Sequence, residues 1–101
     1  MDKFTVFSED ELLTTLKELC DWKIYNDNLE ANFKFPDFRS AIAFINMLAM
    51  ECEKRNHHPV LKNNYKHVEI SLCTHAADNK ITDLDVNMAR YISQIVGKFI
   101  S

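Results

Sequence analysis

The chain has 101 residues, which is enough for one hydrophobic core but not for two. Hydrophobic residues make up 47% and charged residues 27%, as in an ordinary globular protein, so extended disorder is excluded. The formal net charge of -3 offers no general attraction to phosphate backbones or anionic lipid, which argues against direct binding to nucleic acid or to a membrane surface. We therefore expect a single domain over residues 1–101.

Targeting signals and cysteine usage indicate the compartment in which a protein is found. No secretory signal opens the chain, and the longest nearly apolar run, residues 41–50, is about half of the roughly 20 residues that a membrane span needs. The three cysteines, Cys20, Cys52 and Cys73, are widely spaced and form no Cys-x-x-Cys pair, which predicts small core or interface side chains in a reducing compartment. We expect a soluble, cytoplasmic protein without a nucleophilic cysteine.

The first quarter of the chain predicts a helix and a hairpin. Residues 8–11 read Ser-Glu-Asp-Glu, a capping box, and leucines at helical spacing carry the helix to about Cys20. A short strand is expected at residues 22–25. The Asn-Asp-Asn sequence at residues 26–28 favours a hairpin turn without glycine, and strict alternation over residues 29–35 predicts the second strand.

A long helix is expected at residues 38–55. Pro36 ends the preceding strand, Asp37 is a good N-cap, and the residue before Pro59 favours extended backbone, so the helix ends before it. The apolar positions of this helix cover more than one face: Phe38, Ala41, Ile42, Phe44, Ile45, Met47, Leu48, Ala49, Met50 and Cys52. Such a helix is either sandwiched or partly covered by another subunit.

The remaining chain repeats the pattern of hairpin and helix. Strands are expected at residues 60–63 and from residue 68 to about residues 74–75, joined by a turn at residues 64–66. A loop over residues 76–81 precedes a second capping signal, Thr82 with Asp85. The apolar stripe of the last helix consists of Met88, Ile92, Ile95, Val96 and Phe99. The order α-β-β-α-β-β-α predicts an α+β fold, a four-stranded antiparallel sheet with three helices packed on one face.

Candidate chemistry gathers in one part of the sequence. All four histidines fall within residues 57–75, Glu53 lies four residues before His57 on the same helical face, and Asp85 lies in the first turn of the last helix. Imidazoles that change charge near pH 7, with acids to orient them, suit general acid–base catalysis. The adjacent His57 and His58 can line one cavity only if the backbone changes direction there, which the end of the helix before Pro59 allows.

Other interpretations of these residues stay open. Glu53, His57 and His75 could form a three-ligand metal site, although their spacing matches neither His-Glu-x-x-His nor a Cys/His finger. Helix capping alone explains Asp85, and Glu53 fits an ordinary solvated helix residue. His67, beside a turn, is typical of a solvated strand residue.

Several short motifs, taken together, resemble the pterin-4a-carbinolamine dehydratase family. The motifs are Glu53-Lys54-Arg55-Asn56-His57-His58-Pro59, Tyr65, Val68, Leu72-Cys73-Thr74-His75, Ile81-Thr82 and residues 85–89. A weaker match runs back through residues 33–38 to Trp22, so the resemblance covers roughly three-quarters of the chain. The Glu-x-x-x-His-His-Pro and Thr-His pieces in this order are its specific part.

The resemblance implies a dehydratase that uses neither metal nor cofactor. Members remove water from 4a-hydroxytetrahydrobiopterin and give quinonoid dihydropterin, which is recycled beside aromatic amino-acid hydroxylases. The three histidines of the family's active site map to His57, His58 and His75. As a hypothesis, His57 and His75 exchange protons with the two faces of the substrate and His58 holds the pterin. Glu53 and Asp85 orient these imidazoles.

The same resemblance suggests a pocket wall and an assembly. Pro59 and Thr74, His75, Ala76 and Ala77 form the wall and offer backbone hydrogen bonds to the pterin edge. The family forms dimers and tetramers through sheet edges and the long helix, so we expect a homodimer or homotetramer. Some animal members also bind a homeodomain transcription factor, so the alternative function is an oligomeric binding or regulatory module with a relic pterin pocket.

Three positions depart from the family's pattern. Leu61 stands where the family often has Trp, and Asp21 precedes Trp22 where Gly is usual. Lys80 replaces a common glycine, and Asn79 could supply the left-handed conformation instead. The accepted pterin side chain is left open, and so is a biopterin, folate or molybdopterin context.

Overall fold

The computed structural model of the chain describes residues 3–100. Its elements follow one another as α1 (Glu9–Leu16), β1 (Trp22–Tyr25), β2 (Asn28–Lys34), α2 (Phe38–Arg55), β3 (Val60–Asn64), β4 (His67–Leu72), the one-turn 3-10 helix η1 (His75–Ala77) and α3 (Asp83–Ile100). The strands form one antiparallel sheet in the order β1-β2-β4-β3. The predicted α-β-β-α-β-β-α order and the α+β class are confirmed.

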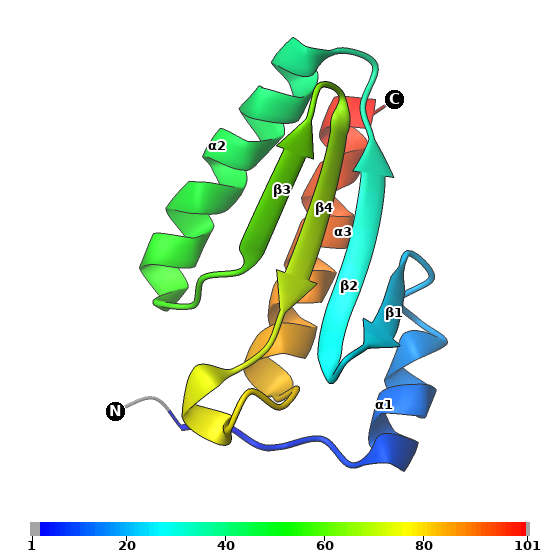
Figure 1. Ribbon diagram of the computed structural model, residues 1–101, viewed down its shortest axis with the longest axis vertical. Coiled ribbons are helices and arrows are strands. Elements are labelled where there is room, and N and C mark those ends of the chain that lie inside the picture. Colours follow the sequence, from blue (N-terminus) through cyan, green and yellow to red (C-terminus); the bar gives the residue numbers. More distant parts are fainter. Residues whose placement is uncertain (1–2, 101) are drawn as a thin grey trace.

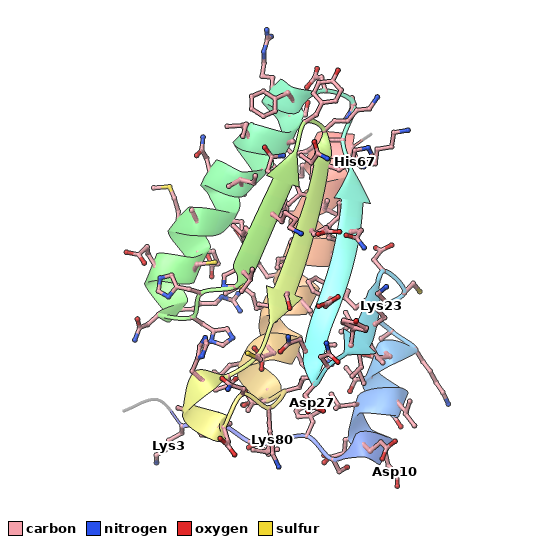
Figure 2. The ribbon with its side chains drawn as sticks, viewed as in Figure 1. Lys3, Asp10, Lys23, Asp27, His67 and Lys80 are labelled. Carbon is pink, nitrogen blue, oxygen red and sulfur yellow. The ribbon has the colours of Figure 1, made fainter. Side chains whose placement is uncertain are left out.

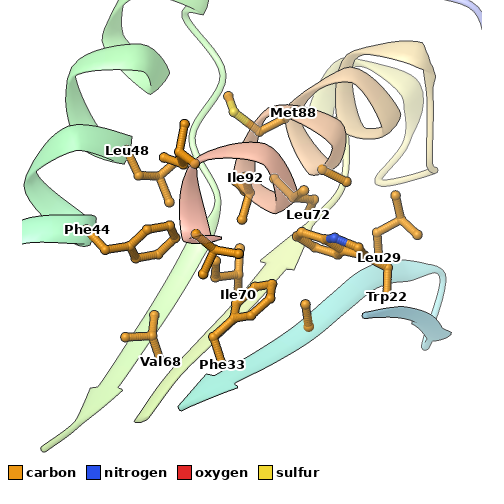
Figure 3. Close-up of a cluster of buried hydrophobic side chains, with 14 of the residues drawn as sticks. Trp22, Leu29, Phe33, Phe44, Leu48, Val68, Ile70, Leu72, Met88 and Ile92 are labelled. Atoms are coloured by element: carbon orange, nitrogen blue, oxygen red, sulfur yellow. The ribbon is translucent and has the colours of Figure 1, made fainter. Parts of the chain in front are cut away.

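Alternation along the strands gives the sheet one buried face and one exposed face. Leu29 lies opposite Leu72, and Phe33 lies opposite Val68, with all four side chains buried. The helices α2 and α3 cover this face (Figures 1 and 3). Leu16 of α1 packs against the same cluster. Each large apolar side chain buried here contributes about 1.5–3 kcal/mol, so this layer fixes the elements that carry the candidate site.

The turns of this glycine-poor chain use asparagine and aspartate. In the β1–β2 hairpin, Asn26 and Asp27 have φ values of 51° and 63°, which confirms the hairpin turn predicted without glycine. After η1, Asp78 and Asn79 have φ values of 62° and 61°, so the left-handed conformation expected at Asn79 is also confirmed. Asx side chains tolerate this region better than other non-glycine residues. In the β3–β4 turn Tyr65 has a φ of 58°, a costly conformation for a bulky residue.

The first helix is shorter than its leucine spacing predicts. It ends at Leu16 and does not reach Cys20. The next turns tighten to i–3 hydrogen bonds, including Glu18 N–H to Thr15 O at 2.9 Å and Leu19 N–H to Leu16 O at 3.2 Å. The prediction was wrong because a tightened turn also brings Leu19, 4% exposed, into the core.

The end of the fourth strand differs from the sequence prediction. The strand β4 ends at Leu72, because Thr74 leaves the ladder and forms an isolated bridge with Lys80. Cys52 is buried and Cys73 half-buried, as expected of packing residues. Cys20 is exposed and so contributes nothing to the core of this chain.

The long helix α2 also carries two large apolar side chains outside the core. Ala41, Phe44, Leu48 and Cys52 are buried against the sheet and α3. The side chains of Phe38 and Met50, at 48% and 76% exposure, face away from the core. Within residues 3–100, no helix combines the length and the apolar character needed to cross a bilayer.

The C-terminus of α2 reverses the chain at Asn56. This residue has φ 50° and ψ 45°, and its N–H donates to Glu53 O, while the His57 N–H donates to Cys52 O at 3.0 Å. These two bonds form a Schellman motif with asparagine in the position that glycine usually occupies. The change of direction expected near His57 and Pro59 therefore lies one residue earlier.

We predict that Asn56→Ala lowers the free energy of unfolding by about 1 kcal/mol. The left-handed conformation is unfavourable for alanine, whereas the asparagine side chain can stabilise it by a local hydrogen bond. Asn56→Gly is expected to equal or exceed the wild type. Urea denaturation followed by circular dichroism measures both. The control is Asn46→Ala, an exposed right-handed position of the same helix, where alanine stabilises by up to about 0.5 kcal/mol. Equal stability of Asn56→Ala and wild type would contradict the account.

Candidate active site

The centre of the candidate site is the buried carboxylate of Asp85, in the first turn of α3. Its exposed fraction is 0%. Its Oδ1 lies 2.6 Å from His57 Nε2, and its Oδ2 accepts from the Thr74 hydroxyl at 2.8 Å and from the Thr82 N–H at 2.9 Å. A buried carboxylate is stable only when it is fully hydrogen-bonded, and this one has three donors. Asp85 therefore connects the end of α2, the end of β4 and the start of α3.

The two threonine hydroxyls beside Asp85 have fixed roles. The Thr74 hydroxyl donates its only proton to Asp85. In the 2.6 Å contact between Thr74 Oγ1 and Thr82 Oγ1, Thr82 is therefore the donor and Thr74 the acceptor. The Thr82 Oγ1 in turn accepts from the Leu84 N–H at 3.2 Å. Thr74 and Thr82 are 4% and 0% exposed. The donor and the acceptor of each hydrogen bond between Thr82, Thr74 and Asp85 are therefore fixed, and both hydroxyl protons are used.

These bonds select one tautomer of His57. Asp85 already accepts two other hydrogen bonds and a carboxylate can only accept, so the shared proton lies on His57 Nε2. The other ring nitrogen, Nδ1, forms no hydrogen bond within residues 3–100, yet no buried side-chain nitrogen or oxygen there lacks a partner. Nδ1 therefore reaches the surface, although the side chain is only 10% exposed. A neutral His57 presents an unprotonated nitrogen outward.

The second acid–imidazole pair joins Glu53 and His58, at 2.5 Å between Oε2 and Nε2. The shared helical face of Glu53 and His57 suggested a different pair. The reversal at Asn56 instead turns His57 inward to Asp85 and leaves His58 beside Glu53. Both side chains of this pair are largely exposed, 56% for His58 and 76% for Glu53, so the pair adds little to stability.

The third candidate, His75, begins η1 directly after Thr74 and is exposed. The turn at residues 75–77, yellow in Figure 1, lies at the same end of the molecule as the C-terminus of α2. Hydrogen bonds link His57 to Asp85 and Asp85 to Thr74. His58 directly follows His57 in the sequence, and His75 directly follows Thr74. His67 is labelled at the opposite end of the sheet in Figure 2 and is exposed, which confirms its interpretation as a solvated strand residue.

The expected wall residues differ in what they can offer a ligand. Pro59 is half-buried, Ala76 is exposed and Ala77 is 8% exposed. The N–H groups of Thr74 and Ala77 already donate to Lys80 O and Thr74 O. Within the described chain, the N–H groups of His75 and Ala76 form no hydrogen bond, so these two are the backbone donors left for a ligand.

The geometry also bears on a nucleophilic cysteine and on a metal site formed by Glu53, His57 and His75. Burial, with the nearby charge of Asp85, raises the pKa of the Cys73 thiol, which keeps it protonated and poorly nucleophilic at neutral pH. Over residues 3–100 no cluster of three or more His, Cys, Asp or Glu side chains is placed to hold a metal ion. Glu53 and His57 have separate partners, so the set Glu53, His57 and His75 is not assembled as a metal site.

The sequence alone did not identify Thr82 as part of the hydrogen-bond network around Asp85. Its pairing with Asp85 was interpreted as a helix cap, and the Thr82 N–H does donate to Asp85 Oδ2. The same bond also places the carboxylate that receives His57. A capping signal is complete within four residues, so it gave no reason to look further.

Comparison with known proteins identifies the family of this chain. The family model described as pterin 4 alpha carbinolamine dehydratase matches residues 5–95. The chain belongs to the pterin-4a-carbinolamine dehydratase family. Relatives from Opitutus terrae and Prochlorococcus marinus, provisionally named pterin-4-alpha-carbinolamine dehydratases, are 37% and 38% identical. The matches cover 90% and 92% of this chain and 94% and 96% of theirs.

Solved structures show the same fold. A crystal structure from Brucella melitensis, described as a transcriptional coactivator/pterin dehydratase, superposes with a TM-score of 0.87 at 35% identity. The superposition covers 92% of this chain and all of that one. A pterin dehydratase-like protein identified as a RuBisCO assembly factor of the alpha-carboxysome has a TM-score of 0.66 at 20% identity, over 76% of this chain and 90% of that one, and shares the fold.

We predict that Asp85→Asn moves the proton of neutral His57 from Nε2 to Nδ1. The amide oxygen takes the place of Oδ2, where two donors meet, so its NH₂ group faces His57 and requires Nε2 to accept. Replacing the orienting Asp of a serine-protease triad by Asn likewise gives the wrong tautomer and costs about 10⁴-fold in kcat. Ring ¹⁵N shifts of histidine-labelled protein at alkaline pH measure the switch.

The matched control is Glu53→Gln, which alters the partner of His58 and leaves His57 bound to Asp85. Its His57 shifts are expected to equal those of the wild type. An Asp85→Asn protein that keeps its fold and the wild-type His57 tautomer would refute the assignment.

Proposed function

We propose that this protein is a 4a-hydroxytetrahydrobiopterin dehydratase that eliminates water by histidine acid–base catalysis, without metal or cofactor, within tetrahydrobiopterin recycling. The observation that carries the proposal is the bond from His57 Nε2 to the buried Asp85, which leaves Nδ1 outward and unprotonated. Family membership supports a pterin as the substrate. The reaction removes one proton from N5 and the hydroxyl from C4a, and a second proton delivered to that hydroxyl completes the departing water.

The geometry suggests how the two proton transfers are divided. His57, with Nε2 anchored, is suited to accept the N5 proton at Nδ1, and the charge of Asp85 then stabilises the imidazolium. His75, exposed and able to exchange protons with solvent, is suited to protonate the leaving hydroxyl. His58, oriented by Glu53, would hold the pterin ring. The half-buried Pro59 and the free N–H groups of His75 and Ala76 complete the wall.

We further propose that the working form is a homodimer or homotetramer joined partly through α2. Phe38 and Met50 expose large apolar side chains on this helix, and a second subunit could cover them. Hollows of about 340–630 Å³ occur on other parts of the described surface, and the three histidines line none of these hollows. A second subunit could enclose the substrate where the single chain leaves it open.

A binding module is the second candidate function. The Brucella neighbour at 35% identity is described as a transcriptional coactivator as well as a pterin dehydratase, so the fold itself does not require catalysis. In that case the exposed face of α2 would be the functional surface, and the histidines a relic. Activity measurements on matched histidine variants separate the two candidates.

We predict that His57→Ala and His75→Ala each reduce dehydration of freshly made 4a-hydroxytetrahydropterin by at least about 10²-fold, the usual contribution of one acid–base group. The substrate's absorbance change over seconds measures the rate above the buffer reaction. His67→Ala, a change of the same kind at the far end of the sheet, is expected to retain wild-type activity. Wild-type turnover no faster than buffer would end the enzyme proposal, and a panel of pterin carbinolamines would define the accepted side chain.

We predict that Met50→Lys shifts the protein to a smaller species in analytical ultracentrifugation, because burying a charge in an apolar contact is costly. The control is Leu13→Lys, the same kind of change at an exposed apolar residue of α1, which is expected to leave the assembly unchanged. A wild type that sediments as a monomer, or a Met50→Lys variant that assembles like wild type, would remove α2 from the proposed interface.

A further inference from the structure

The N-terminal segment pairs with the residues that lead into α3. This strap, residues 5–7, places Val6 opposite Thr82 in an antiparallel bridge. The Phe7 N–H donates to Ile81 O at 3.1 Å, the Asp83 N–H donates to Thr5 O at 3.0 Å, and the Thr5 N–H donates to Asp83 Oδ1 at 2.8 Å. Figure 1 shows the blue N-terminal segment passing alongside the start of α3 before it enters α1.

The strap's hydrogen bonds fall on both sides of Thr82. Ile81 and Asp83, its two chain neighbours, are bonded to the strap, while Thr82 directs its own N–H to Asp85 Oδ2. The preceding loop has left-handed residues at 78 and 79 and is tied back by the Thr74–Lys80 bridge, which ends two residues before Thr82. The strap therefore restrains the backbone on both sides of Thr82, and the Thr82 N–H in turn helps to orient the Asp85 carboxylate.

We propose that the strap is a positioning element of the active site: through Thr82 and Asp85 it keeps His57 in the orientation that exposes Nδ1. This inference rests on the proposed function. Residues 5–7 form no hydrogen bond with His57, so we assign them a positioning role and not a catalytic one. Val6 is 44% exposed, so hydrogen bonds hold this part of the strap more than burial does. Loss of the strap's hydrogen bonds is therefore expected to change the geometry of the site more than the free energy of unfolding.

The test variant is Asp83→Ala, which removes the acceptor of the Thr5 N–H. Its matched control is Asp10→Ala, which removes an acid from the first turn of α1 and none of the strap's hydrogen bonds. Asp83→Asn keeps a side-chain oxygen and should restore the wild-type behaviour. Thr5→Pro, which removes the donor of the same bond from an exposed position, is the second variant should Asp83→Ala fold poorly.

Two readouts do not depend on catalysis. Exchange of the Thr82 amide proton is expected to accelerate about tenfold or more in Asp83→Ala and Thr5→Pro, because local opening of the loop exposes it. The His57 ring ¹⁵N signals at alkaline pH should shift from a single tautomer toward a mixture. A fall in kcat of about 5- to 10-fold, with KM within about twofold, should accompany them, as expected when a catalytic group is slightly misplaced.

Each outcome decides the proposal. Faster Thr82 exchange and altered His57 signals in both strap variants, with Asp10→Ala unchanged, support positioning. Unchanged His57 signals in both strap variants overturn it, whether or not stability or activity falls, because the strap is then purely structural. If the wild type shows no dehydration at all, the proposed function fails separately, and the exchange and ring signals still decide whether the strap positions His57.

Discussion

The arrangement depends on burying one negative charge. A carboxylate with no exposed surface would be strongly unfavourable without compensation, and Asp85 is compensated by an imidazole, a hydroxyl and a backbone N–H. The three donors come from His57, Thr74 and Thr82, which belong to the ends of different elements. Loss of any one of them leaves Asp85 under-bonded. The cost of an unsatisfied buried group, about 1–3 kcal/mol, is what ties these three chain segments together.

The scarcity of glycine makes asparagine and aspartate responsible for the chain's changes of direction. At Asn56 this has a chemical consequence, because the left-handed residue decides which imidazole meets which acid. A helix continued for one more turn would place His57 beside Glu53 on the exposed face. The reversal turns His57 inward, to a buried partner, and leaves His58 outside. One backbone conformation thus separates a rigid imidazole from a solvated one.

The sequence alone was sufficient for the order of elements, since periodicity, caps and Asx turns are local signals. Its specific motifs also identified His57, His58 and His75 as candidates. It could not assign their partners, because the contact between residues 57 and 85 depends on how α2 and α3 pack over the sheet. It extended the first helix too far because Leu19 reaches the core equally well from a tightened turn. Thr82 was passed over because its local role as a cap already explained it.

The contrast between the histidines fits the proposed dehydration, in which the side chains move two protons while the C4a–O bond breaks. A base that must take a proton from a defined ring position benefits from a fixed tautomer, and fixing it costs no entropy at the moment of binding when the fold has already ordered the ring. An acid that must be reprotonated in every cycle needs access to water instead. His57 meets the first requirement through Asp85, and the exposed His75 meets the second. Because the two needs conflict, one imidazole cannot serve both equally well, which gives a physical reason for the site to contain more than one.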